Sequence, residues 1–187
     1  MRKRTLIILV GLPASGKSTL RDAMANYVRE MGSTCTVISS DDYIEAEAAK
    51  IGKTYTEAFS QFADAGRRHC NEQMALAMAF GHGVIIWDQT NLTAKKRASI
   101  ANRVSRRLYN VGCIWVSVED DVLATRLKSR PGKEIPDAVI EKMRADFERP
   151  NIDEGFDWYL KVDENMPPEH VFYVFDDLLG INAGVSA

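Results

Sequence analysis

One stretch of sequence decides the fold of this chain: Gly11-Leu12-Pro13-Ala14-Ser15-Gly16-Lys17-Ser18. It satisfies the pattern G-x-x-x-x-G-K-[ST] at every position. The apolar run Leu6–Val10 comes before it, and a segment of helical character, Ser18 to about Met31, comes after it. A strand, a glycine-rich turn and a helix in this order predict a P-loop. Main-chain N–H groups and the positive end of a helix dipole then surround bound phosphate groups.

The residues of this turn have distinct expected roles toward ATP, or another purine triphosphate, and Mg²⁺. Lys17 is expected to reach the β- and γ-phosphates, and the Ser18 hydroxyl to bind Mg²⁺. A glycine-rich turn with a chance lysine is the alternative, but the complete pattern in its strand–helix context favours nucleotide binding. The other residues expected to contact the nucleotide are Gly11, Pro13, Ala14, Ser15, Gly16 and Thr19.

The remainder of the chain alternates short apolar runs with segments of helical period. Such alternation is typical of βαβ units and predicts an α/β fold, a P-loop three-layer sandwich with a central parallel sheet of about five strands. We expect one kinase-type domain over residues 1–187. The strands expected after Leu6–Val10 are Cys35–Ser39, Val84–Trp87, Cys113–Val118 and Trp158–Val162.

Two of the intervening segments have a clear apolar stripe. In Glu57–Met78 the stripe runs from Phe59 to Met78, and in Ala94–Leu108 it ends at Leu108. Further helices are expected to start near Pro136 and to span about Glu169–Leu179. Before the first of these, Pro131 and Gly132 break helical structure, which predicts a small lid at about residues 126–135.

Acidic and polar residues follow two of the predicted strands. Asp41 and Asp42 come after the second strand, while Asp88 ends the third and is followed by Thr90 and Asn91. Ligands collect at the carboxyl ends of parallel strands, where a carboxylate can take a proton from an attacking hydroxyl or hold Mg²⁺ through water. The alternative is that Asp41 or Asp42, and Asn91 or Thr93, only cap the helices that follow. For the later segment we expect both: Thr93 caps and Asp88 faces the site.

Cations suggest two further features. Arg126 and Arg130 flank the predicted lid, and a mobile arginine that closes over a transferring phosphoryl group is a recurring device. Between Lys95 and Arg107 there are six cations and no acid. A nucleic-acid backbone would suit such a face, although a solvated helix surface is the favoured interpretation.

Composition excludes several classes of protein. The formal net charge is −2, which argues against a protein that coats nucleic acid through overall positive charge. The three cysteines are far apart and odd in number, so buried thiols in a reducing compartment are expected rather than disulfides. No segment has the length of a membrane span, and no guanine-reading N-K-x-D motif occurs. We expect a cytoplasmic protein of a bacterium or a phage-infected cell.

Four motifs together resemble the kinase domain of polynucleotide 5′-hydroxyl kinases. The motifs are Gly11–Thr19, Asp41-Asp42-Tyr43, Asp88-x-Thr90-Asn91-Leu92 and Arg126-x-x-x-Arg130, and the similarity covers roughly residues 5–162. The resemblance implies that Asp41 is the general base toward the 5′-hydroxyl of a nucleic acid. It further implies that Lys17, Ser18 and Arg130 act on the ATP phosphates, Arg126 lies near the nucleotide, and Asp88 organises the acceptor side, with Asp42, Thr90 and Asn91 binding substrate.

The sequence departs from this family at two positions beside the expected base. Ser40 and Ile44 stand where the phage enzyme has arginines that hold the acceptor strand. Acceptors of related kinases therefore stay open as alternatives: a hydroxymethylated base in phage DNA, a seryl-tRNA, a nucleoside or a small metabolite. A third alternative is an ATP-hydrolysing switch without kinase activity. Oligomeric state is not predicted.

Overall fold

The computed structural model describes residues 3–163, 165–167 and 171–172, which form an α/β fold around one sheet. All strand pairings in this sheet are parallel, and the strand order is β2-β3-β1-β4-β5. The predicted sheet of about five parallel strands is therefore confirmed. The strands are β1 (Arg4–Val10), β2 (Cys35–Ser39), β3 (Val84–Asp88), β4 (Tyr109–Val116) and β5 (Trp158–Val162).

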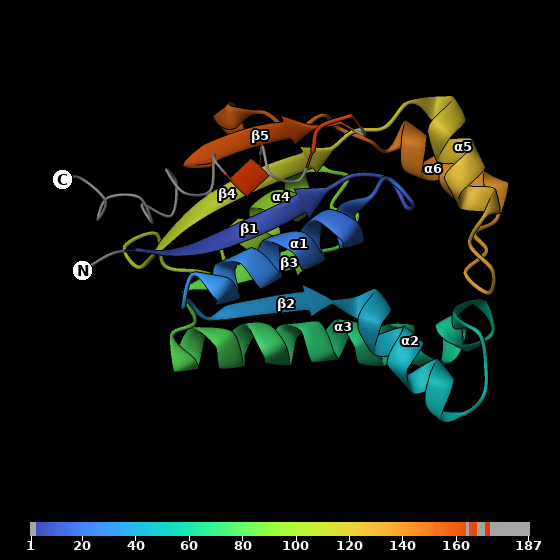
Figure 1. Cartoon of the computed structure of the whole chain (residues 1–187), viewed down its shortest axis with the longest axis horizontal. Coiled ribbons are helices and arrows are strands. Elements are labelled where there is room, and N and C mark those ends of the chain that lie inside the picture. The colour runs from blue at the N-terminus through green and yellow to red at the C-terminus, as the bar shows by residue number, and fades with distance from the viewer. Residues whose placement is uncertain (1–2, 164, 168–170, 173–187) are drawn as a thin grey trace.

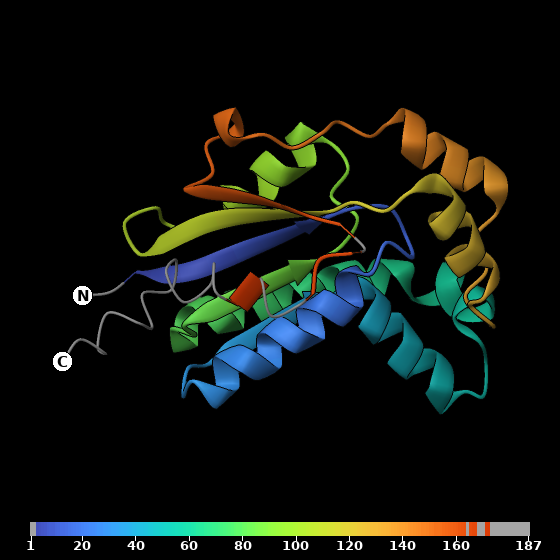
Figure 2. The same cartoon turned by 45° about the horizontal axis from the view of Figure 1, so that its top comes forward.

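Helices cover both faces of the sheet and gather at one end of it (Figures 1 and 2). Helix α1 (Lys17–Glu30) lies on one face, and α3 (Tyr55–Phe80) and α4 (Ala94–Ala101) lie on the other. Three more helices lie beyond the carboxyl ends of the strands, which makes that end the place for a ligand site. They are α2 (Ser40–Lys50), α5 (Asp120–Lys128) and α6 (Asp137–Ala145), and a short 3₁₀ turn, η1 (Ile152–Glu154), precedes β5.

The central strand β1 shows why the chain forms three layers. Its side chains alternate between the two faces. Leu6, Ile8 and Val10 pack with residues of α3 and α4, whereas Ile7 and Leu9 pack with residues of α1. All five are fully buried. A strand buried on both faces reads as a continuous apolar run, which is the signal that precedes the P-loop in the sequence.

The predicted helix Ala94–Leu108 is too long. Helix α4 ends at Ala101, and Leu108, expected on its buried stripe, is 51% exposed. The reason lies in the next strand: β4 begins at Tyr109, paired with Arg4, and not at Cys113 as predicted. Residues 102–108 therefore leave the helix and lead the chain back into the sheet. The six cations between Lys95 and Arg107 consequently do not form one helical face.

Other sequence expectations have mixed outcomes. A helix does start next to Pro136, and Thr93 does cap α4 through its side chain. Within the described residues the three cysteines are free, and none of the helices there combines the length and apolar character that a bilayer crossing requires. The predicted helix Glu169–Leu179 lies largely outside the described residues.

Arg97 is a fully buried cation that ties α4 to two loops. It forms an ion pair with Glu154 of η1, with distances of 2.7 Å from Nε to Oε2 and from Nη2 to Oε1. Its Nη1 donates to the main-chain oxygens of Asn91 and Leu92, both at 3.0 Å. A guanidinium with these partners fixes the loop after β3, where several predicted site residues lie.

We expect Arg97→Ala to lower the free energy of unfolding by about 3–5 kcal/mol, because it leaves Glu154 and two carbonyl groups without their donor. Urea denaturation followed by circular dichroism measures this loss. Lys95→Ala, on an exposed position of the same helix, is the matched control and should change stability by less than about 0.5 kcal/mol. Equal stability of the two variants would contradict the structural role of Arg97.

Candidate active site

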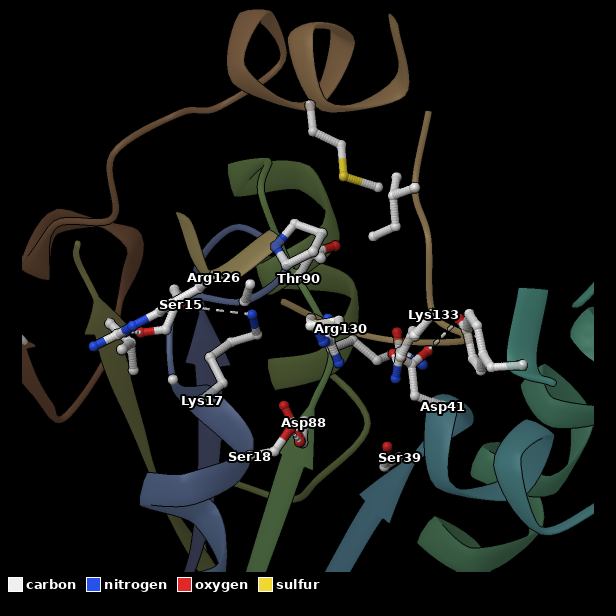
Figure 3. Close-up of a pocket in the computed structure, with 18 of the residues that line it drawn as sticks. Ser15, Lys17, Ser18, Ser39, Asp41, Asp88, Thr90, Arg126, Arg130 and Lys133 are labelled. Carbon is white, nitrogen blue, oxygen red and sulfur yellow. Dashed lines mark hydrogen bonds and ion pairs between the residues drawn. The ribbon is translucent and has the colours of Figure 1, made fainter. Parts of the chain in front are cut away.

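A large cavity, of about 1130 Å³, lies at the carboxyl ends of the strands. Its walls come from the P-loop, the ends of β2 and β3, the start of α3 and the segment from α5 to α6. Asp41 lies beside Lys133 on one side, and Lys17, Ser18 and Asp88 lie on the other, with Arg130 between them (Figure 3). Residues predicted from four separate motifs thus share one cavity.

The P-loop backbone has the conformation that its glycines predict. Gly11 has a φ of 154°, and a Cβ there would lie 2.6 Å from the Val116 carbonyl oxygen. Any larger residue would therefore force β1 and β4 apart. Ala14 also has a positive φ, 64°, which a residue with a side chain rarely adopts. This strained turn is typical of a loop shaped around a ligand.

Lys17 lies folded back on the P-loop. Its Nζ donates to the carbonyl oxygens of Gly11, at 2.9 Å, and Leu12, at 2.7 Å. Burial lowers the pKa of Lys17 to about 8, although the carboxylates of Asp88 and Asp41 oppose this change. The ammonium group is thus held where its charge is costly, and a bound triphosphate would supply the missing anionic partner.

Asp88 is the centre of a second cluster, on the α1 side of the cavity. Its Oδ2 lies 3.5 Å from the Ser18 hydroxyl and accepts from Arg21 Nη1 at 2.9 Å. Arg21 Nη1 also donates to both carboxylate oxygens of Asp42. Burial raises the pKa of Asp88, while Lys17 and Arg21 act in the opposite direction. A hydroxyl beside a carboxylate is a ligand pair of the kind Mg²⁺ prefers.

Asp41 stands at the start of α2, directly after β2, and its carboxylate is held from two sides. Oδ1 accepts from the Tyr55 hydroxyl at 2.9 Å, and Oδ2 lies 2.8 Å from Lys133 Nζ. Burial, followed by the charge of Asp41, raises the pKa of Tyr55, so the phenol stays a donor. The Asp41 side chain is 47% exposed and faces the cavity, which leaves it open to a further ligand.

The position of Asp41 depends on a close contact between α2 and α3. Gly66 of α3 faces the Ser40 main chain, and a Cβ at Gly66 would lie 3.2 Å from the Ser40 carbonyl oxygen. The N-cap of α2 is Ser39, whose hydroxyl accepts from the Asp42 N–H at 3.2 Å. Neither aspartate is therefore the capping residue, which removes the helix-capping alternative for Asp41.

The lid is formed by the end of α5 and the loop to α6, close to the predicted residues 126–135. Arg126 Nη1 donates to the Ser15 carbonyl oxygen at 3.2 Å, so the lid contacts the P-loop directly. On the other side, the Thr56 N–H donates to the Gly132 carbonyl oxygen at 3.0 Å. Arg130 lines the cavity between these two contacts. The lid thus spans the cavity from the P-loop to the start of α3.

The structure does not bring every predicted site residue into the cavity. Thr90 lines it, but Asn91 is buried and its Nδ2 donates to the carbonyl oxygens of Leu9 and Gln89. Its φ of 47° is also unusual, so Asn91 fixes the loop in this structure. The Asp42 carboxylate forms an ion pair with Arg21, and Asp42 is not part of the cavity wall.

Three residues of the site were not anticipated from the sequence: Arg21, Tyr55 and Lys133. The only available signal for Arg21 was its position, one helical turn after Ser18. Tyr55 and Lys133 reach Asp41 from segments far away in the sequence, α3 and the lid. Their partners follow from tertiary packing, and no local pattern indicated them.

The fold and the site together define a P-loop kinase type of domain, and comparison with known proteins gives its family. Residues 6–150 match the family AAA_33, described as an AAA domain. This match covers most of the chain, which therefore belongs to that family.

Two curated relatives and one solved structure illustrate the range of similar proteins. The chain is 27% identical over 133 residues to the Schizosaccharomyces pombe protein named Probable 6-phosphofructo-2-kinase C222.13c, covering 66% of this chain and 22% of that protein. It is 28% identical over 152 residues to the L-seryl-tRNA(Sec) kinase of Methanococcus maripaludis, covering 81% of this chain and 56% of the relative. The chain thus spans about a fifth and about half of their lengths.

The solved structure is that of Mycobacterium tuberculosis APS kinase CysC in complex with AMPPNP and APS. It superposes with a TM-score of 0.58 at 16% identity, covering 96% of this chain and 99% of the other. At this identity the likeness concerns the fold.

The lowered pKa of Lys17 predicts a pH-dependent affinity for ATP. Below about pH 8 the ammonium form predominates, whereas at higher pH the lysine must take up a proton to bind the triphosphate. We expect the Kd for ATP to rise above about pH 8, approaching tenfold per pH unit. Isothermal titration calorimetry between pH 7 and 9.5 measures it. The control is Lys17→Arg, which stays charged and should give a flat profile. A flat profile for the wild type would contradict the prediction.

Proposed function

We propose that this protein is an ATP-dependent phosphotransferase that moves the γ-phosphoryl group of ATP to the 5′-hydroxyl of a polynucleotide. One observation carries the proposal: the Asp41 carboxylate lies in the same cavity as the P-loop, on the opposite side from Lys17. A triphosphate on the P-loop would then have a proton acceptor opposite its terminal phosphorus. Kinases that phosphorylate a hydroxyl need both groups in one site.

Each step of the transfer has a residue in this cavity. The acceptor oxygen attacks the γ-phosphorus, its proton passes to the Asp41 carboxylate, and the bond to the bridging oxygen of ADP breaks. Tyr55 and Lys133 orient the carboxylate before the acceptor arrives. Lys17 and Arg130 stabilise the charge that develops on the phosphoryl oxygens, which is the main catalytic requirement of such a loose transition state.

The Ser18 hydroxyl and the Asp88 carboxylate would hold Mg²⁺ beside the phosphates. They fit because the Ser18 hydroxyl at the start of α1 and the Asp88 carboxylate at the end of β3 present oxygen atoms 3.5 Å apart. When bound, Mg²⁺ would neutralise charge on the β- and γ-phosphates. Arg21 positions the Asp88 carboxylate for this task through its contact of 2.9 Å.

A polynucleotide acceptor is supported by the four motifs shared with polynucleotide kinases and by Arg67 at the edge of the cavity. A second candidate is a kinase for a different hydroxyl, such as that of a hydroxymethylated base, a seryl-tRNA, a nucleoside or a small metabolite. Ser40 and Ile44 favour it, since both line the cavity next to Asp41 without offering a cation. In this case the acceptor is held differently while the chemistry stays the same.

Incubation with γ-labelled ATP and a panel of acceptors distinguishes the candidates. The panel contains 5′-hydroxyl DNA and RNA oligonucleotides, DNA with hydroxymethylated bases, seryl-tRNA and nucleosides. We expect label at the 5′ end, released as a 5′-terminal nucleotide after nuclease digestion. Label on an internal base, on the aminoacyl group, or on a nucleoside but not on an oligonucleotide 5′ end would decide for the second candidate. ATP hydrolysis without transfer to any acceptor would contradict a kinase function.

We expect Asp41→Asn to lower kcat by about 10²- to 10⁴-fold with little change in the Kd for ATP, because a general base acts mainly in the transition state. Steady-state kinetics and calorimetry measure the two quantities. Glu45→Gln is the matched control: it removes the other carboxylate on Lys133, at 2.6 Å, and should leave kcat nearly unchanged. Parallel losses of ATP affinity and rate in Asp41→Asn would show a structural role instead.

A further inference from the structure

One side of helix α3 forms a wall of the cavity. Tyr55, Phe59, Ala63 and Arg67 all line it, and they recur every fourth residue, so they form one stripe along the helix. We call these four residues the α3 stripe. From the lid outward the stripe presents a phenol, a phenyl ring, a methyl group and a guanidinium group. Aromatic and cationic groups in series are a pattern suited to a single nucleic-acid strand.

The aromatic end of the stripe lies beside the proposed base. The rings of Tyr55 and Phe59 are 5.5 Å apart at an interplanar angle of 49°, and the Tyr55 hydroxyl donates to Asp41. Phe59 is 47% exposed, although the sequence predicted it on a buried stripe. A large apolar ring that faces a cavity lacks a partner from the protein core. A base of the acceptor would cover it by stacking.

The cationic end of the stripe continues on the neighbouring segment. Asn71 follows Arg67 by one helical turn, and its Oδ1 accepts from Arg103 Nη1 at 2.6 Å. The Arg103 guanidinium also lies 4.8 Å from the centre of the Trp87 ring, which holds it in place. Arg67 itself pairs with Asp64, but both side chains are exposed, so this pair is weak and can yield to a phosphate.

Lys96 lies on α4, which packs on the same face of the sheet as α3 and leads into the segment of Arg103. Burial lowers its pKa, and the nearby cations Arg103 and Arg67 lower it further. We call Arg67, Lys96 and Arg103 the cation cluster. Like charges from three segments of chain destabilise one another, and an anion between them would remove this cost.

Gln89 connects the cation cluster to the proposed base. Its Nε2 lies 3.4 Å from the Ser40 hydroxyl, next to Asp41, and 3.8 Å from Cys70 Sγ on α3. Gln89 thus joins Ser40, the neighbour of Asp41, to Cys70 on α3, one helical turn after Arg67. Residues after β5, including Asp163, also line the cavity, and β5 is at the opposite edge of the sheet from β2, which leaves that side for the ATP base.

We propose that the acceptor strand lies along α3, with its first base against Tyr55 and Phe59 and its following phosphates on the cation cluster. This inference rests on the proposed function, in that it assumes a polynucleotide acceptor. The cluster supplies the positive charge that Ser40 and Ile44 do not provide beside Asp41. A small metabolite would need only the part of the cavity beside Asp41 and the P-loop. The cation cluster would then have no anion to bind.

The test compares Arg67→Gln and Lys96→Gln with matched controls on neighbouring exposed positions, Arg68→Gln and Lys95→Gln. Acceptors are a nucleoside and a 5′-hydroxyl strand of about twelve nucleotides, assayed across a range of salt concentrations. We expect each cluster variant to lower kcat/KM for the strand about tenfold at low salt and to leave the nucleoside nearly unaffected. The salt dependence of strand binding should weaken by about 0.7 log units per log unit of salt for each lost phosphate contact.

Binding of the same strand, measured by fluorescence anisotropy without ATP, separates the two proposals. Strand binding that depends on Arg67 and Lys96, without 5′ transfer, would contradict the proposed function but support strand binding along α3. Equal kcat/KM values for 5′-end transfer in the cluster variants and the control variants would overturn only the proposed strand binding along α3. Equal losses for nucleoside and strand would also overturn it, because they would place the cations at the reacting groups. Neither transfer nor binding would overturn both.

Discussion

The site depends on the register of three neighbouring parallel strands. Asp88 at the end of β3 lies opposite Leu9 of β1 on one side and opposite Ser39 of β2 on the other. The chain therefore leaves these strands at one level, with the P-loop and the Asp41 segment on either side of Asp88. Because parallel strands share a direction, their carboxyl ends meet at one edge, and groups from distant parts of the sequence converge there.

Convergence of charged groups has an electrostatic cost, which paired contacts offset. The cavity brings together the acids Asp41 and Asp88 and the cations Lys17, Arg130 and Lys133, and the charges of the other four groups all act on the pKa of Lys17. Around them, Arg21 and Tyr55 donate hydrogen bonds to the acids. Such groups are held in place before any substrate arrives, so little rearrangement is needed at the moment of transfer.

Much of the architecture could be predicted from sequence, because its signals are local. The apolar runs predicted all five strands, and the glycine-rich motif with its flanking strand and helix predicted the P-loop. The helix Ala94–Leu108 was predicted too long, since the residues after Ala101 also fit a helical period and the need to enter β4 at Tyr109 is not a local signal. Phe59 likewise fits the apolar period of α3, and yet it faces the cavity.

The site was predictable only in part, for a related reason. Asp41, Asp88 and Arg130 could be placed because a strand end or a helix break marks them in the sequence. Arg21, Tyr55 and Lys133 carry no such mark, because their roles arise from partners in other segments. Asn91 shows the reverse: its position suggested a ligand, but its amide bonds the main chain.

The close contact at Gly66 marks one side of α3 as a packing side and leaves another side to face the cavity. The side that includes Gly66 and Cys70 is committed to packing, since even one added carbon would press on the Ser40 main chain. The side with Phe59 and Ala63 faces the cavity, where the Phe59 ring contacts Tyr55. Substitutions there can enlarge, narrow or recharge the wall while the catalytic groups keep their places. Under the proposed placement of the acceptor along α3, a helix built in this way allows evolution, or an engineer, to exchange one acceptor for another without rebuilding the rest of the site.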